Sequence, residues 1–304
     1  MSAKRLDGVA AAAAIRAEVA EKVGELGGRR PGLAVILAGE DAASQIYVRG
    51  KIRACAEVGI YSELLTPAAT VSTAELLEQV EGLNRRGDID GILVQLPLPP
   101  QVDTAAVLLR VDPDKDVDGF HPVNLGRLMT QRAGPRPCTP AGILELLRRN
   151  GIAVAGREAV VVGRSDIVGK PLALLLLHQH ATVTICHSRT PNLAAVCRRA
   201  ELLFAAVGRP ALLDEKHIAR GAVVVDVGVN RLTDAAEVER YFPGDAGRRE
   251  EFARRGSTLI GDVDPRAACA VASAFTPVPG GVGPLTIAML MSNTLMARKL
   301  KVEG

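Results

Sequence analysis

Tryptophan is absent from the sequence, and aromatic residues make up only 3% of its 304 positions. Proteins that bind single-stranded nucleic acids usually stack the bases on aromatic side chains, so this scarcity argues against such a partner. The formal net charge of +3 is also too small to indicate a protein that binds nucleic acid or a membrane surface. We therefore expect neither nucleic acid nor a membrane as a partner.

Cysteine is scarce and follows no pattern. The five cysteines are Cys55, Cys138, Cys186, Cys197 and Cys269. Their number is odd, and no two of them form a C-x-x-C pair. The His-x-His at residues 178–180 and the Cys-His at residues 186–187 are metal-like, but further ligands at zinc spacing are missing. The pattern predicts no metal site and a reducing, cytoplasmic location.

Long apolar runs are also lacking. No stretch reaches about 18 uncharged apolar residues, so the sequence predicts no membrane-spanning helix. The alanine-rich N-terminus is followed at once by charged residues between Arg16 and Lys22, which predicts an amphipathic helix and not a signal peptide. A hydrophobic content of 48% and a length of 304 residues are typical of one large globular domain or two of ordinary size.

Short apolar runs alternate with helical patterns along the chain. Strands are expected at residues 33–38, 91–99, 158–163, 181–188, 201–208 and 221–230, and helices at 44–58, 73–86, 141–149, 170–178 and from about 285. Strands separated by helices predict parallel sheets with crossover helices, which gives an α/β fold class. The Pro-, Gly- and Arg-rich residues 130–140 are a candidate hinge between two domains.

The stretch "VVVGRSDIVGKP" (160–171) combines a strand, a glycine turn and a helix. Gly163 can form the tight turn, Ser165 offers a hydroxyl, and the N–H groups that follow can face a pyrophosphate. Gly169 would let the helix pack closely on the strand. The spacing is G-x5-G and not G-x-G-x-x-G, so a plain strand-to-helix turn stays an alternative.

The residues after the next strand bear on the choice of dinucleotide. An NAD site usually has an acidic residue there for the ribose hydroxyls, but this strand ends in "HSRT" (187–190). Arg164, Ser188 and Arg189 would instead suit a 2′-phosphate by charge and by hydrogen bonding. The sequence therefore favours NADP over NAD, although Arg189 taken alone is equally consistent with a solvated side chain.

In "SQIYVRGK" (44–51), Tyr47 and Lys51 are four residues apart and so share one face of the expected helix. Taken alone, such a pair is most often an ordinary helix surface. This helix, however, is the first after an expected strand, and ligands bind at the carboxyl ends of the strands in open α/β sheets. Gln95 and Asp118 are expected at the same edge.

Several motifs occur in one order along nearly the whole chain. They are "SQIYVRGK", "DGILVQLPLP", "KDVDGFHPVNLGRL", "CTPAGILELL", "VVVGRSDIVGKPLA", "VDVGVN" and "TPVPGGVGPLTIAMLMSNT". Together they closely resemble the bifunctional methylenetetrahydrofolate dehydrogenase/cyclohydrolase family. The resemblance implies oxidation of 5,10-methylenetetrahydrofolate with NADP+, hydrolysis of the methenyl product to 10-formyltetrahydrofolate, and a homodimer.

The resemblance also implies two α/β domains with a folate cleft between them. Residues 1–138 would form the catalytic domain, completed by a C-terminal helix at 285–304 that returns to it. Residues 139–284 would form a Rossmann-like NADP-binding domain. The segment 233–257 is longer than is usual for the family. Two shorter stretches also depart from the family pattern: "GEDAAS" before the tyrosine, and Leu285 in "GPLT".

Roles for the N-terminal residues follow from the resemblance. Lys51 matches the acid/base of the hydrolysis, and Tyr47 matches the residue that packs on the folate. Gln95 matches the glutamine that tunes the lysine, and Asp118 matches the carboxylate that holds the pterin. The chemistry is compatible, because adjacent pterin N–H donors suit one carboxylate and a partly buried lysine can shuttle protons.

Roles in the second domain are implied in the same way. The cofactor contacts would be Gly163, Arg164, Ser165, Ser188, Arg189, Val229 and Gly283. Gly280 and Gly281 would bind the folate in a loop that closes over the cleft, and glycine allows backbone to approach a ligand closely.

Two alternatives differ in class. Short-chain dehydrogenases also contain Tyr-x-x-x-Lys, but there the motif follows the glycine turn, whereas here Tyr47 precedes Gly163. A non-catalytic module that binds NADP without turnover is disfavoured because Lys51, Gln95 and Asp118 are all present.

Overall fold

The computed structural model describes residues 3–303, with the backbone alone at positions 42, 43, 302 and 303. The chain divides into two compact units. The six-stranded unit contains Met1–Ala11 and Thr139–Leu285, and the three-stranded unit contains Ala12–Cys138 and Thr286–Gly304. Two helices, α1 (Gly8–Gly24) and α12 (Gly283–Glu303), begin in the first of these and continue into the second.

The sheet of the six-stranded unit is entirely parallel. Its strands are β1 (Lys4–Arg5), β5 (Glu158–Val162), β6 (Thr182–Cys186), β7 (Leu202–Ala205), β8 (Val223–Asp226) and β11 (Ala274–Phe275). They lie in the order β1-β11-β8-β7-β5-β6. The short β1 was not predicted, and its pairing with β11 explains why the first residues of the chain group with the later segment.

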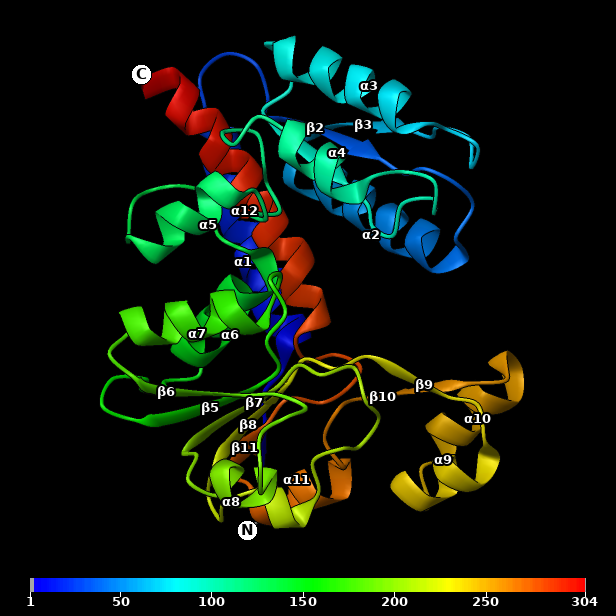
Figure 1. The fold of residues 1–304 in the computed structure, drawn as a ribbon, viewed down its shortest axis with the longest axis vertical. Helices are drawn as coiled ribbons and strands as arrows, with labels where there is room; N and C mark the ends of the chain where they lie inside the picture. Colours follow the sequence, from blue (N-terminus) through cyan, green and yellow to red (C-terminus); the bar gives the residue numbers. More distant parts are fainter. Residues whose placement is uncertain (1–2, 304) are drawn as a thin grey trace. The chain divides into compact units, whose positions relative to one another are not determined.

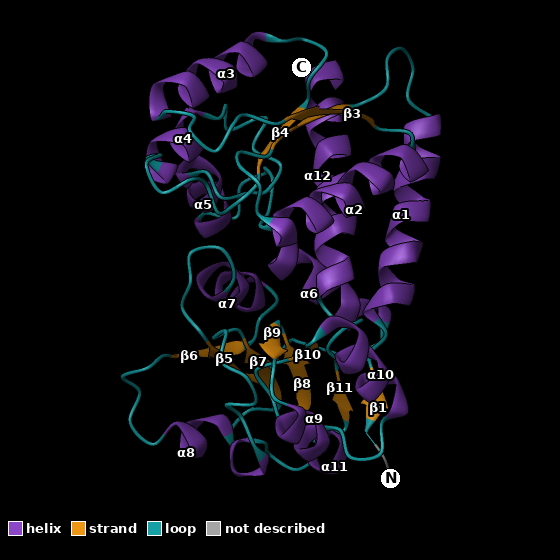
Figure 2. Ribbon diagram, turned by 90° about the vertical axis from the view of Figure 1, so that its right-hand side faces the viewer, coloured by secondary structure: helices purple, strands orange, loops and turns teal. Residues whose placement is uncertain are grey.

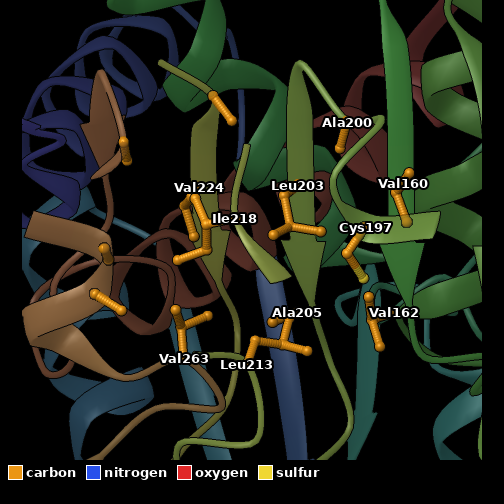
Figure 3. Packing of buried hydrophobic residues seen from close by; sticks show 14 of the residues in the cluster. Val160, Val162, Cys197, Ala200, Leu203, Ala205, Leu213, Ile218, Val224 and Val263 are labelled. Carbon is orange, nitrogen blue, oxygen red and sulfur yellow. The ribbon is translucent and has the colours of Figure 1, made fainter. Parts of the chain in front are cut away.

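Helices cover both faces of this sheet. They are α6 (Cys138–Arg149), α7 (Gly169–His178), α8 (Leu193–Cys197) and α11 (Pro265–Val271), with a 3-10 turn η1 at Glu215–His217. Figures 1 and 2 show α7 on one face and α8 and α11 on the other. Val160 of β5, Leu203 of β7 and Val224 of β8 point into one buried cluster (Figure 3). Apolar runs buried on both faces are typical of parallel sheets.

The three-stranded unit repeats this logic on a smaller scale. Its parallel strands β2 (Gly32–Ile36), β3 (Tyr61–Leu65) and β4 (Gly91–Val94) lie in the order β3-β2-β4. Its helices are α2 (Ala42–Val58), α3 (Thr73–Arg85), α4 (Thr104–Arg110) and α5 (Pro122–Met129). Ala34 and Ile36 pack in one cluster with apolar residues of α3 and α4. Because successive side chains alternate across a strand, Leu33 and Val35 are buried on the opposite face.

The C-terminal helix is bound into the three-stranded unit by polar contacts. The Asn293 amide donates to the carbonyl oxygens of Val117 (2.8 Å) and Arg136 (2.9 Å), and the Lys301 ammonium donates to that of Ile89 (3.1 Å). Within the residues that the structure covers, no helix has both the length and the apolar character to cross a membrane.

The segment 233–257 lies between two short antiparallel strands, β9 (Asn230–Leu232) and β10 (Thr258–Ile260). It forms helices α9 (Ala235–Tyr241) and α10 (Ala246–Arg255), which Figure 1 draws in yellow and orange. The extra length that the sequence shows at this place is therefore largely helical. The buried residues of the two strands and of α9 form a small apolar cluster of their own.

Candidate functional site

The start of α2 places Tyr47 and Lys51. The Asp41 carboxylate accepts a hydrogen bond from the Ser44 amide at 2.7 Å, which caps the helix, and Gly59 ends it in a left-handed conformation. The two side chains differ sharply in exposure: Tyr47 is 49% exposed, whereas Lys51 is 9% exposed. The ammonium group therefore lies mostly out of water beside an accessible aromatic ring.

Gln95 fixes the end of the Lys51 side chain. Its backbone amide continues the β2–β4 ladder by donating to the Ile36 carbonyl at 2.9 Å. The Lys51 ammonium donates to Gln95 Oε1 at 3.0 Å, while Gln95 Nε2 donates to the Leu96 carbonyl at 2.7 Å. This second bond determines which end of the amide faces the lysine. The predicted contact between these two residues is present.

Asp118 is held by a loop that Asp116 organises. The Asp116 carboxylate accepts from the amides of Gly119 (3.1 Å) and His121 (2.8 Å) and from Asn124 Nδ2 (2.9 Å). Gly119 has φ of +75°, and a Cβ there would come within 2.5 Å of the Arg136 backbone, so only glycine fits. The loop consequently presents the half-buried Asp118 in one orientation.

The Asp118 carboxyl is perturbed electrostatically. Burial raises its pKa to about 6, the Asp116 carboxylate adds to this, and the positive charge of Lys51 opposes it. The charge of Lys51 therefore acts on the Asp118 carboxyl, which is compatible with the expected place of both residues at one sheet edge. Among the described residues, no hydrogen-bond donor binds the Asp118 carboxylate, so its oxygens are available to a ligand.

Cys138 and Asn293 complete this group, and sequence reasoning missed both. The buried Cys138 thiol donates to the Val117 carbonyl at 3.3 Å and lies 3.5 Å from Asn293 Nδ2. Burial and the nearby Asp118 charge raise the pKa of this thiol well above its usual value, so it stays protonated. The signal for Asn293 was available, since it is a lone amide in a largely apolar helix.

In the six-stranded unit, the turn after β5 depends on two glycines. A Cβ on Gly163 would lie 2.2 Å from the Ala206 carbonyl oxygen, and φ there is +134°. A Cβ on Gly169 would lie 2.3 Å from the Gly163 carbonyl oxygen. The turn therefore packs backbone against backbone, which allows a ligand phosphate to come close to the chain.

The helix that follows this turn is capped differently from what the sequence suggested. Ser165 Oγ accepts from the amides of Val168 (3.2 Å) and Gly169 (3.3 Å), so these N–H groups bind the serine and do not point freely toward a phosphate. The exposed Arg164 lies beside this cap. The turn would therefore attract an anion mainly through the positive charge of Arg164, because Ser165 already binds the amides of Val168 and Gly169.

The other predicted cofactor residues follow neighbouring strands. Ser188 and Arg189 come directly after β6 and are exposed, and Val229 comes after β8 and is 52% exposed. Parallel strands end at the same edge, so these residues and the turn after β5 lie along one rim of the sheet. The positive charges of Arg164 and Arg189 at this rim fit a phosphorylated dinucleotide.

The loop at residues 276–283 carries the remaining predicted glycines. The Gly8 amide donates to the Gly280 carbonyl at 3.0 Å, and a Cβ on Gly8 would lie only 1.6 Å from the Gly281 carbonyl oxygen. Gly280 has φ of +97°, a conformation that favours glycine. Gly283 is the first residue of α12 and lies against nothing within 4 Å of its Cβ position.

Two family models match this chain. The tetrahydrofolate dehydrogenase/cyclohydrolase catalytic domain matches residues 6–118, and the NAD(P)-binding domain of the same family matches residues 137–302. The chain belongs to the tetrahydrofolate dehydrogenase/cyclohydrolase family. This result confirms the predicted family, its dehydrogenase and cyclohydrolase class, and a two-domain α/β fold with a parallel, Rossmann-like nucleotide-binding sheet.

Individual relatives match over nearly their full length. The bifunctional protein FolD of Koribacter versatilis is 61% identical over 99% of this chain and 98% of its own, and that of Solibacter usitatus is 57% identical over 95% of each. The crystal structure of the Campylobacter jejuni bifunctional enzyme has a TM-score of 0.89 at 40% identity, covering 98% of this chain and 99% of that one. The Trypanosoma brucei enzyme, solved with NADP and an inhibitor, has the same TM-score at 39% identity and full coverage of both chains.

A buried carboxylate pair supports the nucleotide-binding edge of this family member, and sequence reasoning missed it. Asp226 accepts from the amides of Gly228, Asp262 and Val263, each at 2.9 Å. Asp262 in turn accepts from the amides of residues 207–209 (2.6–3.0 Å) and from Asn230 Nδ2 (2.9 Å). Together they fix the loops that follow β7, β8 and β10.

The signal for this pair was in the quoted motif "VDVGVN", which contains Asp226, and in "GDVD" (261–264), which contains Asp262. Each of these aspartates comes at the end of a short apolar run. Sequence reasoning assigned no role to either residue. As for metals, the described residues contain no cluster of three or more histidine, cysteine or acidic side chains arranged to hold an ion.

Proposed function

We propose that this protein oxidises 5,10-methylenetetrahydrofolate to the 5,10-methenyl form with NADP+ and hydrolyses that product to 10-formyltetrahydrofolate. One observation carries the proposal: the buried Lys51 is bonded to Gln95 at 3.0 Å, and its charge acts on an Asp118 carboxyl that has open acceptor positions. This grouping supplies both an anchor for a pterin and a proton carrier. The family models that match the chain describe both reactions.

Asp118 and Tyr47 bind the folate in this proposal. The pterin ring presents adjacent N–H donors that one carboxylate can accept together, and such charge-assisted pairs fix orientation as well as adding affinity. The accessible ring of Tyr47, one helical turn from Lys51, is placed to pack on the flat folate. The substrate carbon is then held near the lysine.

Lys51 serves the hydrolysis. Water adds to the cationic methenyl carbon and loses a proton, and the bond from that carbon to one ring nitrogen then breaks, so that the formyl group remains on the other nitrogen and one proton is released overall. Lys51 would pass the protons between water, intermediate and leaving nitrogen. Gln95 holds the ammonium in place without adding a charge that would compete with the cationic substrate.

The oxidation depends on positioning at the rim of the six-stranded sheet. When bound, NADP+ accepts a hydride from the methylene carbon. Gly163, Arg164 and Ser165 would cradle its phosphates, and Ser188 and Arg189 would bind the 2′-phosphate. Val229 and Gly283 would contact the cofactor, while Gly280 and Gly281 would approach the folate.

A homodimer is the second part of the proposal. Strand β3 is the edge of its three-stranded sheet and exposes Tyr61 (50%) and Leu64 (42%). An edge strand with exposed apolar side chains is suited to pair with the same strand of a second copy. Sedimentation analysis should then give twice the chain mass of 31.9 kDa. A cytoplasmic location is proposed because the five cysteines are all free and four of them are buried.

The decisive experiment mixes purified protein with methylenetetrahydrofolate and either NADP+ or NAD+, and follows the methenyl product by absorbance. We expect turnover with both activities present and a higher kcat/KM for NADP+. No absorbance change at saturating substrate would reject the dehydrogenase. A product that accumulates and is not hydrolysed faster than in buffer would reject the cyclohydrolase alone.

A further inference from the structure

The segment 233–257 is longer than its connection requires. Leu232 and Thr258 are paired residues in the β9–β10 ladder, and a tight turn of two residues can join antiparallel strands at such a point. Instead the chain forms α9 and α10 before it returns. A sheet hairpin therefore explains the ends of this segment but not its length.

Its own apolar cluster holds the segment against the hairpin. Leu232, Val238 and Ile260 are buried, and Tyr241, Phe242 and Phe252 pack against them. Both helices are capped by aspartate side chains, Asp234 and Asp245. The two helices thus have a stable attachment that does not depend on any ligand.

Arg248 is the most buried of the four arginines on the mostly exposed helix α10. Its side chain is only 15% exposed. The guanidinium donates to Thr258 Oγ1 at 3.0 Å and to the Leu259 carbonyl at 2.9 Å, and it lies 4.4 Å from the Phe242 ring centroid. It also donates to the carbonyl of Val278. One side chain thereby joins α10, strand β10 and the loop at residues 276–283.

That loop is held at three positions by hydrogen bonds to different elements. Thr276 Oγ1 accepts from the Asp226 amide at 2.7 Å, and the Gly8 amide donates to the Gly280 carbonyl at 3.0 Å. The bond from Arg248 to Val278 is the third, and it lies between the other two along the loop. Residues 277 and 279 are prolines and have no N–H to donate, so carbonyl oxygens must supply the attachment here.

We propose that Arg248 is a positioning residue that sets the loop at residues 276–283 for folate, and that the segment 233–257 serves to carry it. This inference rests on the proposed folate role of Gly280 and Gly281. The guanidinium is rigid and planar, and it offers several donors at fixed angles, so it can satisfy acceptors on two elements at once. A displacement of about 1 Å at a substrate-binding loop is enough to reduce turnover strongly.

The electrostatics agree with a fixed rather than a mobile arginine. Burial lowers the pKa of Arg248, the Glu251 and Asp245 carboxylates oppose that effect, and the nearby Arg5 adds to it. Glu251 lies 3.8 Å from the guanidinium. A buried guanidinium is costly to leave unpaired, so the side chain is held at its carbonyl acceptors.

The test compares Arg248→Met, which keeps an apolar stem over Phe242, with Arg248→Lys and with Arg249→Met as the matched control. Arg249 is on the same helix, but it is 54% exposed, and its one ion-pair partner among the described residues is Glu239. For each variant we would measure Tm, NADP+ affinity by calorimetry, kcat and KM for methylenetetrahydrofolate, and hydrogen exchange of peptides that cover residues 276–285.

We expect Arg248→Met to raise the folate KM about tenfold and to speed exchange in the loop, with NADP+ affinity within about twofold of wild type. Arg248→Lys should give a folate KM and a loop exchange rate between those of wild type and Arg248→Met, because one ammonium cannot reproduce the fixed donor geometry of the guanidinium. Arg249→Met should match wild type in all four readouts.

Unchanged KM and loop exchange in a folded Arg248→Met variant would overturn the inference, and so would equal losses of folate and NADP+ binding, which would indicate general destabilisation. If Arg248→Met does not fold, Arg248→Lys decides by the same readouts. Absence of turnover in the wild-type protein would instead reject the proposed function itself, so the two failures are distinct.

Discussion

Each unit of the molecule contains a carboxylate whose pKa is raised, and the two carboxylates differ in how many hydrogen-bond donors the protein gives them. Burial and the neighbouring Asp262 raise the pKa of Asp226 to about 7, but three backbone amides bind its two oxygens. Burial raises the pKa of Asp118 to about 6, and no donor among the described residues binds it. The first carboxylate is satisfied by the fold, whereas the second is left for a ligand.

Two buried lysines within the three-stranded unit repeat the contrast. Lys115 donates to three backbone carbonyls, those of residues 83, 84 and 86, at 2.6–2.9 Å, and burial lowers its pKa to about 8. Lys51 has Gln95 as its one hydrogen-bond partner among the described residues. An ammonium can donate three bonds, so Lys115 is saturated and Lys51 is not.

Burial alone therefore does not identify a functional group. A perturbed pKa is found at structural and at chemical sites alike. What separates them here is whether the protein itself fills the hydrogen-bonding capacity of the group. Predictions that remove one group of each kind test this distinction directly.

The largest effect is expected from Lys51→Met. Loss of the Lys51 ammonium at the proposed reaction centre should reduce hydrolysis of methenyltetrahydrofolate by at least about 100-fold, the usual range for a general acid/base. The decay of methenyl absorbance measures this. Arg53→Met is the control, because Arg53 is exposed on the same helix and pairs with Glu57. Hydrolysis at the wild-type rate in Lys51→Met would remove Lys51 from its role.

Asp118→Asn should follow. The substitution replaces one of the two acceptor oxygens by an NH2 group, which would face a pterin N–H donor, so kcat/KM for methylenetetrahydrofolate should fall about 10- to 100-fold, mainly through KM. The wild-type kcat/KM should also decline as pH falls through about 6, because protonation then removes the same acceptor. The variant should lack that decline. Asp114→Asn is the control, because Asp114 is an exposed neighbour paired with Arg127, and it should behave as wild type. An Asp118→Asn variant whose kcat/KM still declines as pH falls through about 6 would contradict the assignment.

A smaller change is expected from Arg189→Ala at the rim of the six-stranded sheet. If its charge meets the 2′-phosphate, kcat/KM for NADP+ should fall about tenfold while that for NAD+ stays unchanged. Arg198→Ala is a suitable control, because its guanidinium is already bonded to the Lys216 carbonyl at 2.8 Å. Equal losses with both cofactors would mean that Arg189 contributes only general attraction.

Much of the fold was predictable because it depends on local pattern. The runs around Val160 and Val224 are short, apolar and separated by helices, so the parallel sheet followed from composition. Strand β1 was not predictable, because residues 4–5 have no apolar pattern and become a strand only by pairing with distant β11. Local propensity contains no information on such pairing.

The site divides in the same manner. Motif and position predicted Lys51 and Gln95 as neighbours, because the helix that carries Lys51 follows β2, Gln95 follows β4, and these adjacent parallel strands end at one edge. The saturation of Asp226 by three amides from two loops, those after β8 and β10, could not be predicted, since these loops meet only in the folded chain. The same reason hid the bond between Arg248 and the Val278 carbonyl, which lie thirty positions apart in sequence.

The smallest effect on turnover, and the sharpest test of the contrast, is expected from Asp226→Asn. The pKa of Asp226 in the folded protein is about 7, above its usual 3.8, so folding retains a proton that the unfolded chain has released. This group therefore contributes stability that is fully present below about pH 4 and is lost as pH rises through about 7, by at most about 1.4 kcal/mol per pH unit. Urea unfolding between pH 5 and 8 should show that slope in wild type and not in the variant.

The expected result depends on burial outweighing the three amide donors, which favour the ionised carboxylate. If the donors prevail, Asp226 stays ionised throughout, and wild type and variant will have parallel pH profiles. Asp264→Asn, a helix cap beside the pair whose side chain is 15% exposed and lies 3.8 Å from the Arg266 guanidinium, controls for general effects of charge removal. Either way, folate KM should stay within about twofold of wild type, because a carboxylate that the fold has already satisfied has no acceptor left to offer a substrate.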